Sequence, residues 1–236
     1  MAEVARVGLD AEAGLGARIV RRGLELGAAG PLSDWLATQE RQLAMVRLFS
    51  QLGWREVSTR RVLEIGCGDG ENLLDLVRMG FAPRNLAGIE AAADRFARAM
   101  QSLPAGVVLM QGDPSLVKLP DESEDIVMLC DVFSSLLDAP FQWRLAQLLW
   151  RWVRPGGGVL WYDTIVGDAR DPAVRAVPLA RIRELFPAGR LRYERITLNS
   201  PLARRVSAWH PMLYSGFNLV PWLRSHVLAW IAKPAS

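Results

Sequence analysis

Cysteine is scarce in this chain of 236 residues, which contains only Cys67 and Cys130. Both lie in or beside apolar segments, and their separation is not one that metal sites use. Scarce cysteine of this kind is typical of a reducing compartment, so we expect a cytoplasmic location. A secretory leader is also not expected, because the first residues lack a basic start followed by an apolar run.

A large excess of charge is lacking too. The 28 Lys and Arg residues stand against 25 Asp and Glu residues, which leaves a net charge of only +3. Basic clusters such as Arg204–Arg205 are short, and short clusters usually lie on a solvated face. We therefore expect no nucleic-acid partner. The chain also lacks a clear cluster of metal-ligating residues, so no metal site is predicted.

No long hydrophobic run is free of interruptions. The most apolar stretch, Met212–Ala232, contains Pro221, Arg224 and His226. These residues argue against a membrane-spanning helix, so stable membrane insertion is not expected. Two interpretations stay open. We favour a helical cap followed by a buried last strand; the other is an apolar surface that lines an acceptor pocket or meets a lipid-linked substrate, which leaves peripheral lipid contact open.

Tryptophan is abundant by contrast, with nine residues. Because an indole ring buries a large apolar area, we expect most of them in the core or lining a pocket. The length suits one large α/β domain. Residues 1–55 are predicted to form a helical cover segment, of which the first 30 or so are loose or weakly helical. Residues 56–236 form the main domain, with an acceptor-side insertion at about 200–225.

From Arg61 onward, short apolar runs alternate with amphipathic stretches, which is typical of βαβ units and a parallel sheet. Pro155 is expected to end a helix, and Gly156 to Gly158 are expected to form the turn that follows it. The expected strands are Val62–Ile65, Leu86–Ile89, Val107–Met110, Ile126–Cys130, Val159–Tyr162, Arg192–Leu198 and Val227–Ala232. The expected helices are Gly70–Arg78, Ala92–Gln101, Phe141–Val153, Val177–Phe186 and Pro201–Trp209, with another that begins near Ser33 and stops at Gly53.

The strongest signal is the segment Val62–Leu76, a strand that runs into Gly66, Gly68 and Gly70 and then into a helix. Alternate glycines let the backbone turn sharply and approach a flat ligand. Dinucleotide-binding proteins place G-x-G-x-x-G here, whereas this chain has G-x-G-x-G. Glu64 ends the strand with a carboxylate, which suits a cationic or amine-bearing ligand better than a pyrophosphate.

The stretch Arg61–Asp163 resembles the class I S-adenosylmethionine-dependent methyltransferases, whose first motif, E-x-G-x-G-x-G, it matches without gaps. The resemblance implies a Rossmann-like α/β fold with a seven-stranded, mostly parallel sheet, helices on both faces and an antiparallel last strand. It also implies S-adenosyl-L-methionine as the cofactor. The residues that it assigns to the cofactor site are Glu64, Gly66, Cys67, Gly68, Gly70, Asn72, Glu90, Ala91, Gly112, Asp113, Pro114 and Cys130.

Three of these residues have a specific role in the resemblance. Glu90 is expected to accept hydrogen bonds from both ribose hydroxyls. Ala91 would present a small wall toward the adenine. Asp113 is expected to accept a hydrogen bond from the adenine amine; alternatively, it is a turn residue before Pro114, as Asp-Pro often is.

Acceptor-side residues in such folds follow the fourth and fifth strands or precede the last strand. The candidates are Asp131, Ser134, Ser135, Tyr162, Asp163, His210 and Tyr214. His210 is the first choice of general base, since histidine titrates near neutrality, and Asp131 and Asp163 are the other catalytic candidates. The alternatives are that His210 caps the corner between Trp209 and Pro211, that Asp163 bonds the backbone, and that Asp131 caps a helix.

Methyl transfer from a sulfonium is a direct displacement, so the protein mainly aligns the reacting atoms. We expect transfer to oxygen or nitrogen of a small-molecule acceptor, such as a sugar-containing or specialised metabolite. The alternatives are a non-catalytic scaffold that binds the cofactor and a nicotinamide-dependent oxidoreductase. RNA or protein methylation is less favoured, because no recognition domain or basic tract accompanies the motif. A homodimer is left open.

Overall fold

The structure is a computed structural model that describes residues 32–167 and 173–235. The expected cover segment before residue 32 therefore lies outside the described residues. The helices are α2 Leu32–Gln51, α3 Glu71–Arg78, α4 Ala93–Ser102, α5 Ala139–Trp152, α6 Leu179–Leu185, α7 Ser200–Trp209 and α8 Pro211–Asn218. The strands are β1 Val62–Ile65, β2 Leu86–Glu90, β3 Val108–Gln111, β4 Glu124–Cys130, β5 Val153–Thr164, β6 Arg190–Leu198 and β7 Arg224–Ala232.

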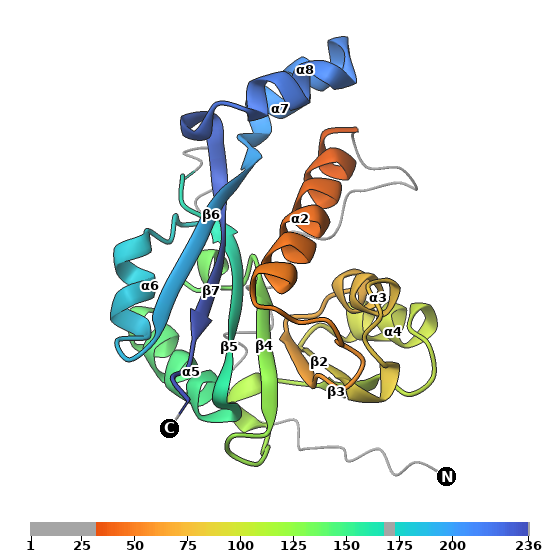
Figure 1. The fold of residues 1–236 in the computed structure, drawn as a ribbon, viewed down its shortest axis with the longest axis vertical. Coiled ribbons are helices and arrows are strands. Elements are labelled where there is room, and N and C mark those ends of the chain that lie inside the picture. The colour runs from red at the N-terminus through yellow and green to blue at the C-terminus, as the bar shows by residue number, and fades with distance from the viewer. Residues whose placement is uncertain (1–31, 168–172, 236) are drawn as a thin grey trace.

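The seven strands form one sheet in the order β3-β2-β1-β4-β5-β7-β6 (Figure 1). β1 runs parallel to both β2 and β4, whereas β7 runs antiparallel to β5 and to β6. The expected Rossmann-like architecture is confirmed. The strand order reverses between β1 and β4, and in such sheets ligands bind beyond the carboxyl ends of the strands at that point.

Helices cover both faces of the sheet, so the central strands are apolar in both directions. Along β4, Val127 and Leu129 join the cluster under α5 and α6, while Ile126 and Met128 join the cluster under α2 and α3. This alternation follows from the two-residue period of a strand. The continuous apolar run Ile126–Cys130 is thereby explained as a strand buried on both faces.

A helical cap connects β6 to β7 and extends past the end of the sheet (Figure 1). It consists of α7 and α8, which contact α2, and its small core contains Leu198, Ala203, Val206 and Tyr214. β7 is buried along most of its length. The favoured interpretation of the C-terminal stretch, a cap followed by a buried strand, is therefore confirmed.

The structure differs from the sequence expectations at several places, among them the expected turn before β5 and the burial of tryptophan. The segment Pro155–Gly158 lies inside β5 rather than in a turn, and the pairing with β4 shifts register there, which the left-handed φ of 78° at Gly156 accommodates. Trp209 and Trp222 are also exposed by 84% and 78%, against the expectation for tryptophan. Trp209 ends α7 and Trp222 lies in the short turn Pro221–Leu223 between α8 and β7, and the small core of the cap does not bury them.

Candidate active site

The glycine loop has the backbone that its sequence predicts. Gly66, Gly68 and Gly70 have φ angles of 68°, 58° and 86°, a region that other residues enter at a cost. A Cβ on Gly70 would also lie 2.7 Å from the Leu103 side chain. The loop between β1 and α3 therefore depends on these glycines to stay close to its neighbours.

Glu90 joins this loop to the end of β2. Its carboxylate is buried, with Oε2 accepting a hydrogen bond from the Gly68 amide at 2.7 Å and Oε1 accepting one from the Ala92 amide at 2.8 Å. A carboxylate offers about four lone-pair positions, so two stay available after these bonds. By this count the residue holds the loop and keeps acceptor capacity for ligand hydroxyls.

Glu64, Asn72 and Arg41 form a chain of hydrogen bonds beside the loop. The Asn72 amide donates to Glu64 Oε1 at 2.6 Å, and Arg41 Nη2 donates to Asn72 Oδ1 at 2.8 Å. Glu64 Oε2 and Arg41 Nε are buried and have no hydrogen-bond partner among the described residues. A carboxylate and a guanidinium with free capacity match a ligand that carries both an ammonium and a carboxylate group.

Arg41 was missed in the sequence analysis. It comes from α2, which contacts the main sheet, and its guanidinium carbon lies 5.1 Å from the centroid of the Tyr162 ring. No motif spacing links this residue to a loop that begins some 25 positions later in the sequence. Its placement depends on tertiary packing, including the nearby bond from Gln42 to Asp75 on α3.

Burial raises the pKa of Glu64 to about 8, and the Glu90 charge acts in the same direction, while Asn72 and Arg41 oppose the shift. The unfolded chain would ionise this carboxyl near 4.5. Because the folded state holds its proton more tightly, Glu64 lowers stability progressively as the pH rises from about 4.5 to about 8. The loss of folding stability caused by Glu64 is small at acidic pH and reaches its full size above the pKa of the folded state.

Glu64→Gln is accordingly expected to stabilise the protein by roughly 3 kcal/mol at pH 7, because glutamine keeps the acceptor for Asn72 without the buried charge. Thermal unfolding between pH 5 and pH 8 measures the effect: the difference from the wild type should grow with pH. Glu71→Gln, on the exposed first turn of α3, is the control. A difference that is equal at both pH values would contradict the account.

The remaining cofactor candidates lie around the same edge. Asp113 Oδ1 accepts a hydrogen bond from the Ser115 amide at 2.7 Å and so caps the turn Pro114–Leu116. This confirms the turn role, and contact with adenine stays a prediction. The Gly112 amide donates to the Glu90 carbonyl at 3.0 Å, which joins the ends of β2 and β3.

The two cysteines contribute mainly to packing. The Cys67 sulfur would lie 2.7 Å from a Cβ at Gly88, so this thiol faces β2, and only its backbone lines the loop. Burial raises the pKa of both cysteine thiols. Cys130 ends β4, and Ala91 follows Glu90 and is half-buried.

A second cluster lies where β4, β5 and β7 meet, around Asp131 and His226. His226 Nε2 lies 3.5 Å from Asp131 Oδ1. The His226 ring stacks on Tyr162, with 5.0 Å between centroids and 11° between planes. The Tyr162 hydroxyl in turn lies 2.9 Å from Thr197 Oγ1. These contacts bring the Asp131 carboxylate and the His226 imidazole together with the Tyr162 ring, which also lies against Arg41.

His226 was also missed, although it is one of only two histidines. It lies inside an apolar strand, where histidine is commonly a buried structural residue. The pairing of Thr164 with His226 between β5 and β7 brings it to the site. Predicting that register from the sequence would have identified it.

Asp163 holds the loop after β4 in place. Its Oδ2 accepts from the Ser134 amide at 3.0 Å, and its Oδ1 accepts from the Thr164 amide at 2.8 Å. Burial raises the pKa of Asp163, and the neighbouring Asp131 charge adds to the shift. Ser135 Oγ donates to the Val132 carbonyl. This geometry agrees with the backbone-bonding alternative for Asp163.

His210 lies in the cap rather than beside Asp131. It is exposed, and its Nδ1 accepts a hydrogen bond from the Met212 amide at 3.2 Å, so it caps the start of α8. The corner-capping alternative is confirmed, while a catalytic role stays a prediction. Tyr214 points inward instead, and its hydroxyl donates to Glu40, which also accepts from the Thr197 amide.

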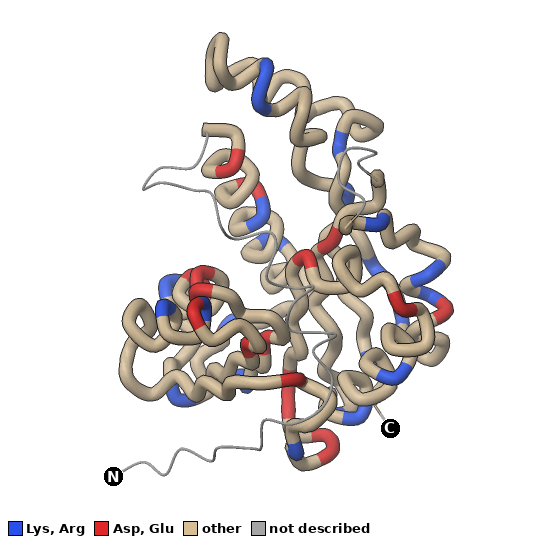
Figure 2. Tube along the Cα trace, turned by 180° about the vertical axis from the view of Figure 1, so that it is seen from behind, with Lys and Arg blue, Asp and Glu red and all other residues tan. Residues whose placement is uncertain are grey.

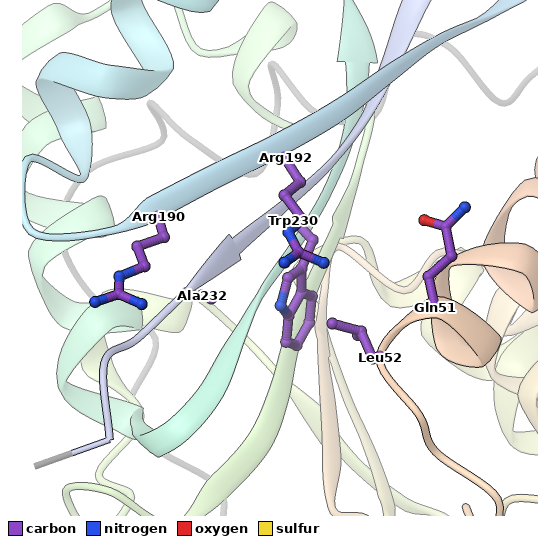
Figure 3. Close-up of a pocket in the computed structure, with 6 residues that line it drawn as sticks. All are labelled: Gln51, Leu52, Arg190, Arg192, Trp230 and Ala232. Carbon is purple, nitrogen blue, oxygen red and sulfur yellow. The ribbon is translucent and has the colours of Figure 1, made fainter.

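A surface pocket lies at the other end of the sheet (Figure 3). There Ala232, the last residue of β7, pairs with Arg190, the first residue of β6, and with Gly158 of β5. The glycine loop, in contrast, follows the carboxyl end of β1. This pocket is therefore separate from the candidate active site. Its lining residues are Gln51, Leu52, Arg190, Arg192, Trp230 and Ala232.

Comparison with known proteins agrees with this geometry. Residues 62–157 match a family model described as a methyltransferase domain. The fatty-acid O-methyltransferase of Mycolicibacterium smegmatis is 36% identical over 110 residues, which are 46% of this chain and 38% of that protein. The chain thus matches less than half the length of this curated relative.

Solved structures share the fold at low identity. A SAM-dependent methyltransferase from Archaeoglobus fulgidus has a TM-score of 0.56 at 14% identity, with 85% of this chain and 99% of that chain covered. One from Mesorhizobium loti has a TM-score of 0.57 at 15% identity, covering 81% and 95%. Phosphoethanolamine N-methyltransferase 2 of Haemonchus contortus has a TM-score of 0.58 at 17% identity, covering 82% and 52%.

Proposed function

We propose that this chain, whose residues 62–157 match a methyltransferase-domain model, transfers a methyl group from S-adenosylmethionine to a small-molecule acceptor. The observation that carries the proposal is the pairing of Glu64 and Arg41 beside the glycine loop. Their unsatisfied Oε2 and Nε atoms suit the ammonium and carboxylate of an amino-acid group. Glu90, with two free acceptor positions, suits a ribose.

The same residues fit a dinucleotide less well. A pyrophosphate would favour the protonated form of Glu64 that burial already favours, whereas a ligand ammonium group would lower the pKa of Glu64 and bind its carboxylate. The domain assignment and this charge arrangement both disfavour the nicotinamide alternative. A folded protein that bound NAD and not S-adenosylmethionine would reverse the ranking.

When bound, S-adenosylmethionine supplies an electrophilic methyl group, and the acceptor attacks it as the carbon–sulfur bond breaks. The protein must hold the acceptor in line and receive any proton that the acceptor loses. We assign the second task to Asp131, which follows β4, and to His226, which lies near the start of β7 and pairs with Thr164 at the end of β5. Tyr162, stacked on His226, restricts the orientation of the ring.

This pair favours a hydroxyl acceptor, since an alcohol loses a proton as it is methylated. A carboxylate acceptor is the second candidate, and the fatty-acid O-methyltransferase relative favours it. Incubation with labelled S-adenosylmethionine and matched dodecanol, dodecanoic acid and dodecylamine separates these classes. Label in the ether supports the first, label in the ester supports the second, and label only in the amine contradicts both.

We expect His226→Gln and Asp131→Asn to lower turnover by about 100-fold or more on a hydroxyl acceptor, with the cofactor Kd nearly unchanged. The pH profile of the residual activity should also lose its dependence on an ionising base, which a purely structural role would not produce. His210→Gln is the matched histidine control. A greater loss of turnover in His210→Gln than in His226→Gln would restore His210 as the base.

A further inference from the structure

The cap carries a cluster of outward-facing apolar side chains, which we call the apolar tip. It lies within residues 209–222 and is exposed despite the large size of its members. Six of the sixteen large hydrophobic residues that are exposed in the described chain lie in this short segment. They are Trp209 at 84%, Met212 at 75%, Leu213 at 38%, Phe217 at 40%, Leu219 at 77% and Trp222 at 78%.

The tip is not the result of a loosely packed helix. On α8, Tyr214 turns inward, is 3% exposed and donates its hydroxyl hydrogen to Glu40. Met212, two positions before Tyr214, points to about the opposite side of the helix and is 75% exposed. Leu213 and Phe217 lie on its flanks and are 38% and 40% exposed. The orientation of α8 is thus set by its buried side, and its apolar outer side is left with nothing to cover it among the described residues.

The charge of the segment that carries the tip has one sign, whereas the neighbouring α2 contributes Asp34 and Glu40, the second of which accepts a hydrogen bond from the tyrosine of α8. Glu194 is the last acidic residue of the chain, and every charged side chain after it is basic. Arg204 and Arg205 on α7 are exposed, and Figure 2 shows basic but no acidic positions along α7 and α8. Two copies of the tip would therefore bring like charges together, whereas an anionic surface would attract them.

We propose that the apolar tip docks the protein on an anionic phospholipid bilayer. Tryptophan and other large apolar side chains would enter the headgroup region, and Arg204 and Arg205 would contact lipid phosphates. Within residues 32–167 and 173–235, no helix is long and apolar enough to cross a membrane, so the contact is peripheral. The cap lies at the end of the sheet that bears Asp131 and His226 (Figure 1), so docking would bring the acceptor site close to lipid.

Flotation of the full chain with vesicles tests the proposal. Co-flotation is expected with phosphatidylcholine vesicles that contain phosphatidylglycerol, and it should weaken without phosphatidylglycerol or at high salt. Trp209→Ser/Trp222→Ser is expected to reduce vesicle partitioning at least about 10-fold. Arg204→Gln/Arg205→Gln should reduce it by a similar factor at low salt only. Trp143→Ser, at an exposed tryptophan of α5, is the control and should partition normally.

Absence of co-flotation at low salt would overturn the proposal, as would an equal loss in the Trp143 control. Light scattering supplies a further outcome: a dimer that dissociates in the Trp209/Trp222 variant, without vesicle binding, would assign the tip to a second copy. Titration of the same samples with S-adenosylmethionine separates this result from the proposed function. Normal cofactor binding without vesicle binding would remove the docking proposal alone.

Discussion

Replacement of Glu90 by alanine is expected to lower the affinity for S-adenosylmethionine by at least about 100-fold, the largest effect of any single change at the site. Two bonds from ribose hydroxyls to a charged acceptor would contribute about 1.5–3 kcal/mol each. The same substitution removes the acceptor of the Gly68 and Ala92 amides, so the loop also loses its tie to β2. Calorimetric titration measures the affinity.

A control variant must distinguish the loss of contacts to the cofactor from a loss of stability of the folded protein. Asp125 is buried and accepts hydrogen bonds from the Arg60 side chain and the Arg61 amide, near the start of β4 rather than its end. Asp125→Asn is expected to lower the melting temperature and leave the cofactor Kd nearly unchanged in folded protein. Normal binding in folded Glu90→Ala protein would show that Glu90 does not hold the ribose.

Arg41→Ala is expected to weaken S-adenosylmethionine binding by about 10- to 100-fold, the range for one or two charge-assisted hydrogen bonds. Arg47 provides the control on the same helix: it forms an ion pair with Glu194, in which the two side chains are 47% and 46% exposed. An exposed pair of this kind contributes little. Arg47→Ala should therefore bind the cofactor normally.

A change of ligand makes the Arg41 test specific. Decarboxylated S-adenosylmethionine lacks the carboxylate that Arg41 is proposed to hold, so the wild type and Arg41→Ala should bind it with similar affinity. An equal loss for both ligands would assign Arg41 a structural role through Asn72. Such a result would leave the cofactor assignment intact and remove only this contact.

The elements around the glycine loop could be predicted closely because local chemistry determines them. β1 is found at Val62–Ile65 as expected, since its apolar run ends at glycines that must adopt positive φ. The early start of β4 at Glu124 was not predicted. Two acidic residues do not suggest a buried strand, and their burial is compensated by ion pairs with Arg60, Arg61 and Arg154.

The acceptor side was less predictable because its residues meet through tertiary packing. His226 reaches Asp131 only through the antiparallel register of β7, and Arg41 reaches Asn72 only because α2 packs beside α3. Neither relation leaves a spacing in the sequence. The sequence favoured His210 as a base because it is a histidine, yet its position between two helices makes it the N-terminal cap of α8. The cofactor side of the site is therefore encoded locally, whereas the acceptor side depends on the completed fold.

The most direct test is calorimetric titration of the full chain with S-adenosylmethionine, S-adenosylhomocysteine and NAD. The structure predicts micromolar binding of the first two ligands and none of NAD, because Glu64, Arg41 and Glu90 match an amino acid joined to a ribose. Binding of NAD alone, or no binding of S-adenosylmethionine by folded protein, would contradict the proposed function.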